Sequence, residues 1–232
     1  NRFKQDARLR EKVVALNNQY VKEKVPATID HAIDLVHQGD SISATSKLLL
    51  RNDSEEPLQK LIFSLNDGLK ISRLTVGGNE VPFTREYHLV MATDNVSLLP
   101  GAETTVEITY SGKINEKLCY LDIDEETMQE KYGKFVINVD KRFAFITPSY
   151  VLLTPEANWY PRLGVTYSST DVSWNQTQFI NFNLNVKTSV GLKAVSQGKI
   201  NAIADGQISF QNEHPMTQLS LAIGNCQYKS MV

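Results

Sequence analysis

From Thr28 onward, apolar and polar residues alternate with a period of two, and this pattern constrains the fold more than any other feature of the sequence. In the segment TIDHAIDLVH, every second residue would lie on one face of a strand. A second such segment, SISATSKLLLRN, follows Gly39-Asp40, a pair typical of a hairpin turn. The pattern therefore predicts a hairpin with one buried face. The residues expected on that face are Ile29, His31, Ile33 and Leu35, then Ile42, Ala44, Ser46, Leu48 and Leu50.

Short strand-like segments continue to the end of the chain, with turn signals such as the NDG triplet at 66–68 and the GG pair at 77–78. The segment Asp122 to Lys134 is acidic and has no strand period, so we expect a surface insertion or a short helix there. Many short strands at close spacing are typical of antiparallel all-β folds. The fold class predicted is all-β: a large antiparallel β-sandwich or saddle-like sheet with one N-terminal α-helix.

The segment Asn1 to Lys24 is the only strongly helical part of the sequence, and Pro26 ends it. Its apolar stripe is thin and most of its other residues are charged. We therefore expect residues 1–25 to form an amphipathic stalk or linker that contributes little to the β core, and residues 26–232 to form the β domain. The apolar stripe consists of Phe3, Ala7, Val13, Val14 and Leu16.

Composition excludes several classes of function. Hydrophobic residues make up 41% and charged residues 22%, the mix of an ordinary globular protein. The net charge of −2 and the lack of a basic run argue against a nucleic-acid partner. No apolar stretch reaches the ~20 residues that a membrane span needs. The chain begins with Asn1 rather than Met, so we expect it to be cut from a longer polypeptide.

The sequence offers no recognisable catalytic or metal chemistry. The histidines are scattered and form no HExxH pair, and there is no GxSxG segment. Cys119 and Cys226 are far apart and form no CxxC pair, so we interpret them as free thiols that are not bonded to each other. The prediction is a chain that is not itself an enzyme and binds no metal or cofactor.

The segment TPEANWYPRLG, Thr154 to Gly164, is the most unusual stretch of the sequence. It places Trp159, Tyr160 and Pro161 together behind a lone acid, Glu156. Three interpretations stay open from the residues alone: a carbohydrate-stacking loop, a buried structural corner, or the rim of another domain's active site.

Three stretches together resemble the N-terminal β domain of the aminopeptidase N family of zinc peptidases. LLPGAETTVEITYSGKI, Leu98 to Ile114, resembles a family segment with a Tyr-x-Gly step. FNLNVKTSVGLKAVSQGKI, Phe182 to Ile200, is similar to that domain's later strand pair. FQNEHPMTQLSLAIGNCQY, Phe210 to Tyr228, is similar to the Pro-Met-(Ser/Thr) strand that closes the domain. Their order and spacing cover nearly the whole chain after the helix.

The resemblance implies a role for Glu156. In that family, the acid or amide of a Thr-x-x-(Glu/Gln) step helps to bind the free amino terminus of the peptide substrate, and Glu156, which follows Thr154 with one residue fewer between them, is the residue that corresponds to it. A carboxylate suits this task because it accepts charge-assisted hydrogen bonds from an ammonium group. The alternative is a solvated loop acid.

The resemblance also implies what surrounds the domain. This chain would be a non-catalytic accessory domain of a larger aminopeptidase N-like protein, forming one wall of the peptide cleft. Its partner would be a downstream catalytic domain of the same polypeptide, which would hold the zinc. Some bacterial relatives resemble fusions of membrane-transporter segments to a peptidase-like half, so we expect a membrane-tethered, extracytoplasmic location. The alternative is a free-standing extracytoplasmic β-sandwich module for glycan or protein ligands, with Trp159 and Tyr160 stacking on the glycan.

Overall fold

A computed structural model describes residues 2–94, 96–119, 144–166, 177–204 and 206–227 of the chain. The described part contains three β-sheets and one α-helix, which confirms the all-β class with a single N-terminal helix. The acidic segment Asp122 to Lys134 lies outside the described residues.

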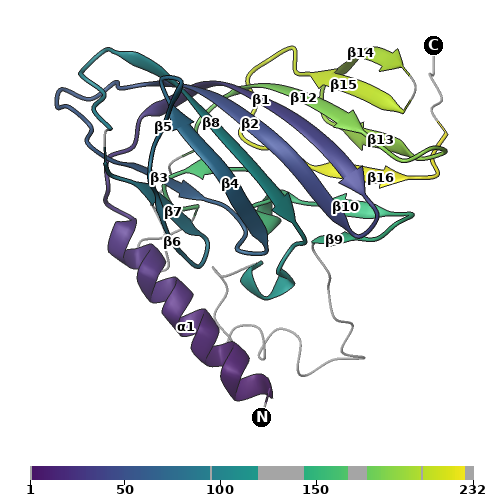
Figure 1. Ribbon diagram of the computed structural model, residues 1–232, viewed down its shortest axis with the longest axis horizontal. Coiled ribbons are helices and arrows are strands. Elements are labelled where there is room, and N and C mark those ends of the chain that lie inside the picture. Colours follow the sequence, from purple (N-terminus) through teal and green to yellow (C-terminus); the bar gives the residue numbers. More distant parts are fainter. Residues whose placement is uncertain (1, 95, 120–143, 167–176, 205, 228–232) are drawn as a thin grey trace.

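An eight-stranded sheet dominates the molecule and curves across it (Figure 1). Its strand order is β14-β15-β12-β1-β2-β8-β4-β5. All of its pairings are antiparallel except that of β1 with β12, which run parallel with Asp30 opposite Asn181. The sheet is therefore antiparallel, as predicted, except at this one parallel pairing. The strands are β1 (Ala27–Gln38), β2 (Ser41–Arg51), β4 (Leu69–Val76), β5 (Asn79–Glu80), β8 (Glu103–Gly112), β12 (Asn181–Lys187), β14 (Lys199–Ala204) and β15 (Gln207–Gln211).

Two four-stranded sheets complete the sandwich, with orders β13-β16-β10-β9 and β11-β3-β7-β6. One core cluster unites buried residues of all three sheets, including Ile33 of the large sheet, Phe63 of β3 and Ile223 of β16. The strands are β3 (Leu61–Ser64), β6 (Thr84–Glu86), β7 (Leu89–Ala92), β9 (Ala144–Ile146), β10 (Val151–Leu153), β11 (Arg162–Leu163), β13 (Lys193–Ser196) and β16 (Leu221–Gly224). Two 3-10 turns, η1 (Glu116–Leu118) and η2 (Pro155–Ala157), lie in loops between them.

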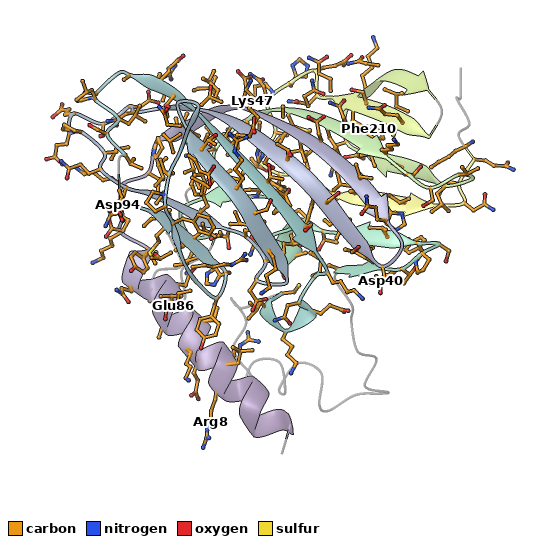
Figure 2. The ribbon with its side chains drawn as sticks, viewed as in Figure 1. Arg8, Asp40, Lys47, Glu86, Asp94 and Phe210 are labelled. Atoms are coloured by element: carbon orange, nitrogen blue, oxygen red, sulfur yellow. The ribbon has the colours of Figure 1, made fainter. Side chains whose placement is uncertain are left out.

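The predicted hairpin is present, with its turn at Gly39, where φ is +61°. All five residues expected on the inner face of β2 are buried. On β1 the prediction fails only at Ile29, because a register shift between Thr28 and Asp30 buries Thr28 in its place. The alternate residues face outward, and exposed Lys47 lies on this outer face of the large sheet (Figure 2).

The helix α1 (Arg2–Tyr20) lies outside the sheets, beside β6 and β7 (Figure 1). It packs more firmly than its thin apolar stripe predicts. Leu16 and Val21 form a buried cluster with Ile62 and Leu89, and Val13 is fully buried. These clusters are separate from the main core cluster, which contains none of the described residues of the helix. The boundary at residue 25 remains a prediction.

Candidate functional site

The loop after β10 presents one carboxylate from an otherwise buried segment. Between Pro155 and Pro161, Glu156 is the only exposed residue, and the other six are buried. The turn η2 forms here because Pro155 occupies its first position and fixes φ there. Asn158 ends the turn in the left-handed conformation, with φ +48°, which Asn tolerates better than most residues. The loop therefore holds Glu156 at the surface of a fixed scaffold.

Trp159 and Tyr160 are 0% and 1% exposed, so they anchor this loop from below. The Trp159 indole Nε1 donates a 3.3 Å hydrogen bond to the Leu219 carbonyl. The Tyr160 ring makes edge contacts with Trp159, His31 and Phe182 at centroid distances of 4.7, 5.5 and 5.9 Å. The carbohydrate-stacking interpretation of Trp159 and Tyr160 was therefore wrong, because neither ring reaches solvent. The cluster is a buried corner.

The side chain of Asn66 is a second anchor of the Glu156 loop. The sequence predicts only a turn at this residue. Its Nδ2 donates to the carbonyl of Ala157 at 3.0 Å and to that of Asn115 at 3.1 Å. Its backbone N–H donates to the carbonyl of Asn158 at 2.8 Å. Asn66 thus joins the Glu156 loop to the loop that carries η1. The NDG signal at 66–68 predicts the turn but not these contacts, whose partners are distant in the sequence.

The surroundings of Glu156 carry a second acid. Burial raises the pKa of the Cys119 thiol to about 12, and the negative charges of Glu116 and Glu156 both add to this shift. Both carboxylates therefore lie near the same thiol, and both are exposed. Burial also raises the pKa of the Tyr160 hydroxyl, with Arg162 opposing the shift and Glu156 adding to it. An exposed carboxylate on a fixed loop can accept hydrogen bonds from a cationic ligand.

Cys119 is buried, Cys226 is half-buried, and both are free thiols in this structure. Three of the histidines, His31, His37 and His88, are buried. Within the described residues, no group of three or more His, Cys, Asp and Glu side chains is placed to hold a metal ion. This part of the chain thus does not fit a zinc ion.

An open groove of about 550 Å³ lies elsewhere, on the outer face of the large sheet. Its lining does not include Glu156 and mixes charges of both signs, such as Lys47 and Glu107. No helix in the part of the chain that the structure describes is both long and apolar enough to cross a bilayer.

Comparisons with known proteins identify the fold. No protein-family model matches the sequence, and no curated protein matches it. Among solved structures, the chain is similar to an M1 zinc metallopeptidase from Deinococcus radiodurans, with 14% identity and a TM-score of 0.61. A variant of that enzyme bound to a Tyr-Ser-Ala substrate matches at 15% identity, also with a TM-score of 0.61. A yeast LTA4 hydrolase matches at 15% identity with a TM-score of 0.58.

These matches cover 87% of this chain for the bacterial enzyme and 88% for the yeast enzyme. The chain spans only 43% of the bacterial enzyme and 30% of the yeast enzyme, so each match is to part of a longer protein. At this level of identity, the likeness describes the fold. That fold is the one of an aminopeptidase N-like N-terminal β domain, as the three sequence stretches predict.

Proposed function

We propose that this chain is a non-catalytic accessory domain of a larger aminopeptidase N-like protein. In this proposal, it packs on a downstream catalytic domain and forms one wall of the peptide-substrate cleft. The observation that carries the proposal is the exposure of Glu156 alone within the buried segment 155–161, on a fold shared by parts of a zinc metallopeptidase and of an LTA4 hydrolase. The zinc would belong to the downstream domain.

The role proposed for Glu156 is to bind the free amino terminus of a peptide. A peptide ammonium group carries three donors and a positive charge, and a carboxylate offers two acceptor oxygens and the opposite charge. Because the loop is fixed by Trp159, Tyr160 and Asn66, little conformational entropy is lost when it binds. Nearby Glu116 adds negative potential, which favours the same ligand.

The test of Glu156 uses the complete polypeptide that carries this domain. Its Kd for a Tyr-Ser-Ala peptide is compared with its Kd for the N-acetylated peptide, which has no ammonium group. We expect Glu156→Gln to weaken binding of the free peptide by about tenfold or more, since hydrogen bonds to charged groups contribute ~1.5–3 kcal/mol. Binding of the acetylated peptide should not change.

A matched control is Glu213→Gln, another exposed acid, which lies in the loop after β15. This substitution removes the same charge and should preserve the preference for the free amino terminus. If Glu156→Gln and Glu213→Gln give the same ratio of the two Kd values as the unsubstituted protein, Glu156 has no part in binding the amino terminus.

The domain context is tested by the gene that encodes this chain. We expect it to continue past Val232 into a segment with HExxH on a helix and a further Glu downstream, which together supply two His and one Glu to zinc. Upstream, we expect membrane-spanning segments that would tether the domain on the outer side of a membrane. A gene that ends at Val232 would refute the accessory-domain proposal.

A further inference from the structure

We infer that Asn66 is the positioning residue for Glu156: its buried side chain holds the carbonyl of Ala157, its backbone N–H holds that of Asn158, and these two bonds together determine where the carboxylate stands. The inference rests on the proposed function of Glu156 as the acceptor for a peptide amino terminus. Asn66 is 1% exposed, so it does not touch the ligand itself. Its effect would pass through the backbone of the loop.

The contacts of Asn66 leave its side chain one orientation. On one side, Nδ2 faces two carbonyl oxygens, those of Ala157 and Asn115. On the other side, Oδ1 accepts from the backbone N–H of Gly68 at 3.1 Å and from that of Asn115 at 2.8 Å. An amide flip would place an oxygen against two carbonyls and an NH₂ group against two N–H donors, so all four bonds would be lost.

Two other described hydrogen bonds of the Glu156 loop lie as close to its carboxylate. The hydrogen bonds within η2, from Ala157 N–H to Thr154 and from Asn158 N–H to Pro155, are local and would move with the turn. Asn66 instead connects two successive carbonyls, those of Ala157 and Asn158, to the turn between β3 and β4. The residue directly before these two is Glu156. A shift of their carbonyls is therefore a shift of the proposed binding group.

Arg85 of β6 supports Asn66 from the opposite side. Its guanidinium donates to the Asn66 carbonyl at 2.6 Å and to the Leu65 carbonyl at 3.0 Å. The same guanidinium also donates to the carbonyls of Leu69 and Tyr87. The turn that presents Asn66 is thus held on its carbonyl side by a cation with several donors, which limits how far Asn66 can move.

The chain contains a matched control in Asn52. This residue is also fully buried, and its Nδ2 donates to two carbonyls, those of Glu56 and Leu98, at 2.8 Å each. Its Oδ1 accepts from the N–H and the hydroxyl of Ser54. Asn52 therefore fixes a loop with the same chemistry as Asn66, but it makes none of these contacts to the Glu156 loop. Substituting either residue should cost similar stability.

The first experiment measures position without any ligand. In the 232-residue chain, amide hydrogen exchange is followed at Ala157 and Asn158 in Asn66→Ser and in Asn52→Ser. We expect exchange at these two amides to be about tenfold faster in Asn66→Ser, because the loop opens more easily without the bond from Asn66 Nδ2 to the Ala157 carbonyl. Asn52→Ser should leave both amides unchanged. Equal exchange in the two variants would overturn the inference. If Asn66→Ser does not fold, Asn66→Asp, which keeps both acceptor contacts, is compared with Asn52→Asp in the same way.

The second experiment measures the effect on binding in the complete polypeptide. The ratio of the Kd values for acetylated and free Tyr-Ser-Ala is determined for Asn66→Ser, Asn52→Ser and Glu156→Gln. Partial unfolding lowers the binding of both peptides equally and does not change this ratio. We expect the ratio to fall about tenfold in Asn66→Ser and to stay constant in Asn52→Ser, since a displaced carboxylate loses its charge-assisted bonds.

The two proposals fail in different ways. A ratio that falls with Glu156→Gln but not with Asn66→Ser overturns the positioning role and leaves the role of Glu156 intact. A ratio that does not change with Glu156→Gln refutes the proposed function. In that case, the role of Asn66 in binding falls with it, whatever the exchange rates of the loop.

Discussion

The backbone N–H of Leu219 donates a 3.0 Å hydrogen bond to the hydroxyl oxygen of Tyr160, and both residues are buried. The neighbouring Trp159 donates to the carbonyl of the same Leu219. Two adjacent aromatic residues therefore satisfy both backbone groups of one residue just before β16. This explains why a strand-rich chain carries a Trp-Tyr-Pro cluster: the aromatic pair joins the Glu156 loop to the segment just before β16.

Removing the Tyr160 hydroxyl should destabilise the contact between Tyr160 and Leu219. In Tyr160→Phe, the buried N–H of Leu219 loses its acceptor, and we expect the free energy of unfolding to fall by roughly 1–3 kcal/mol. Urea unfolding followed by circular dichroism measures the change. The control is Tyr150→Phe at a residue that is 43% exposed, where we expect a change within about 0.5 kcal/mol. Equal values for the two variants would contradict a structural role of the Tyr160–Leu219 bond.

Much of the large sheet could be predicted from the sequence, because its signal is local. The alternation in β2 identifies every buried residue of that strand, since side chains of a strand point to opposite faces in turn. The parallel pairing of β1 with β12 could not be predicted. It brings Asp30 beside Asn181, and no local pattern specifies which distant strand becomes a neighbour. The register shift near Thr28 is a similar case.

In the candidate site too, only the local features could be predicted from the sequence. The resemblance makes Glu156 the candidate binding residue, because it lies in a short motif. Burial of Trp159 and Tyr160 decides between a corner and a sugar platform, and burial depends on what the rest of the chain places over them. The sequence does not predict that Asn66 fixes the Glu156 loop, since its partners Asn115 and Ala157 lie 49 and 91 residues away. Only the assembled sheets bring these residues together.

The helix should contribute to the stability of the domain through Leu16. This side chain is 6% exposed and packs with Ile62, Leu89 and Val165. We expect Leu16→Ala to lower the free energy of unfolding by about 2–3 kcal/mol, since it leaves a cavity between the helix and the sheet. Thermal unfolding is the measurement.

Gln19 lies in the same helix, is exposed and provides the control. Gln19→Ala keeps the helix and should change stability by less than about 0.5 kcal/mol. If Leu16→Ala were as stable as Gln19→Ala, the helix would be no more than a stalk. Deletion of residues 1–25 should then also be tolerated, whereas the packing of Leu16 predicts that it is not.

Acid should destabilise the protein through His31. Burial lowers the pKa of His31 from 6.5 to about 3, and its Nε2 has no hydrogen-bond partner among the residues that the structure describes. Between these two values, the unfolded chain binds a proton that the folded chain does not, so stability is fully present above about pH 6.5 and falls as the pH decreases toward 3. At about pH 5, this single group costs roughly 2 kcal/mol.

The variant His31→Leu has a similar volume and cannot bind a proton. Its loss of unfolding free energy between about pH 7.5 and pH 5 should be about 2 kcal/mol smaller than that of the parent. His88 contributes in the same direction, because burial, with the nearby charge of Arg85, lowers its pKa to about 4. A variant in which both His31 and His88 are replaced by Leu should therefore show an even smaller change of unfolding free energy with pH. Identical pH dependence of His31→Leu and the parent would show that His31 is not neutral in the folded chain.

The last prediction concerns Gly68, at the centre of the turn that presents Asn66. A Cβ at this position would overlap the carbonyl oxygen of Lys113 and lie 2.9 Å from the backbone nitrogen of Asn115. Both obstacles are backbone atoms, so Gly68→Ala must push two chain segments apart. We expect it to cost about 1–3 kcal/mol by thermal unfolding. The cost arises from overlap, because Gly68 does not have a positive φ.

Gly39→Ala separates this effect from backbone strain. Gly39 has φ +61° and open space around it, so an Ala there is strained without overlapping any neighbour. Both variants should lose stability. Only Gly68→Ala should also speed amide exchange at Asn158, because displacement of the Asn115 segment breaks the contacts that hold Asn66 in place. If Gly39→Ala accelerates exchange at Asn158 as much as Gly68→Ala does, the loop responds to global stability. In that case, the close packing of Gly68 against Lys113 would play no part in placing Glu156.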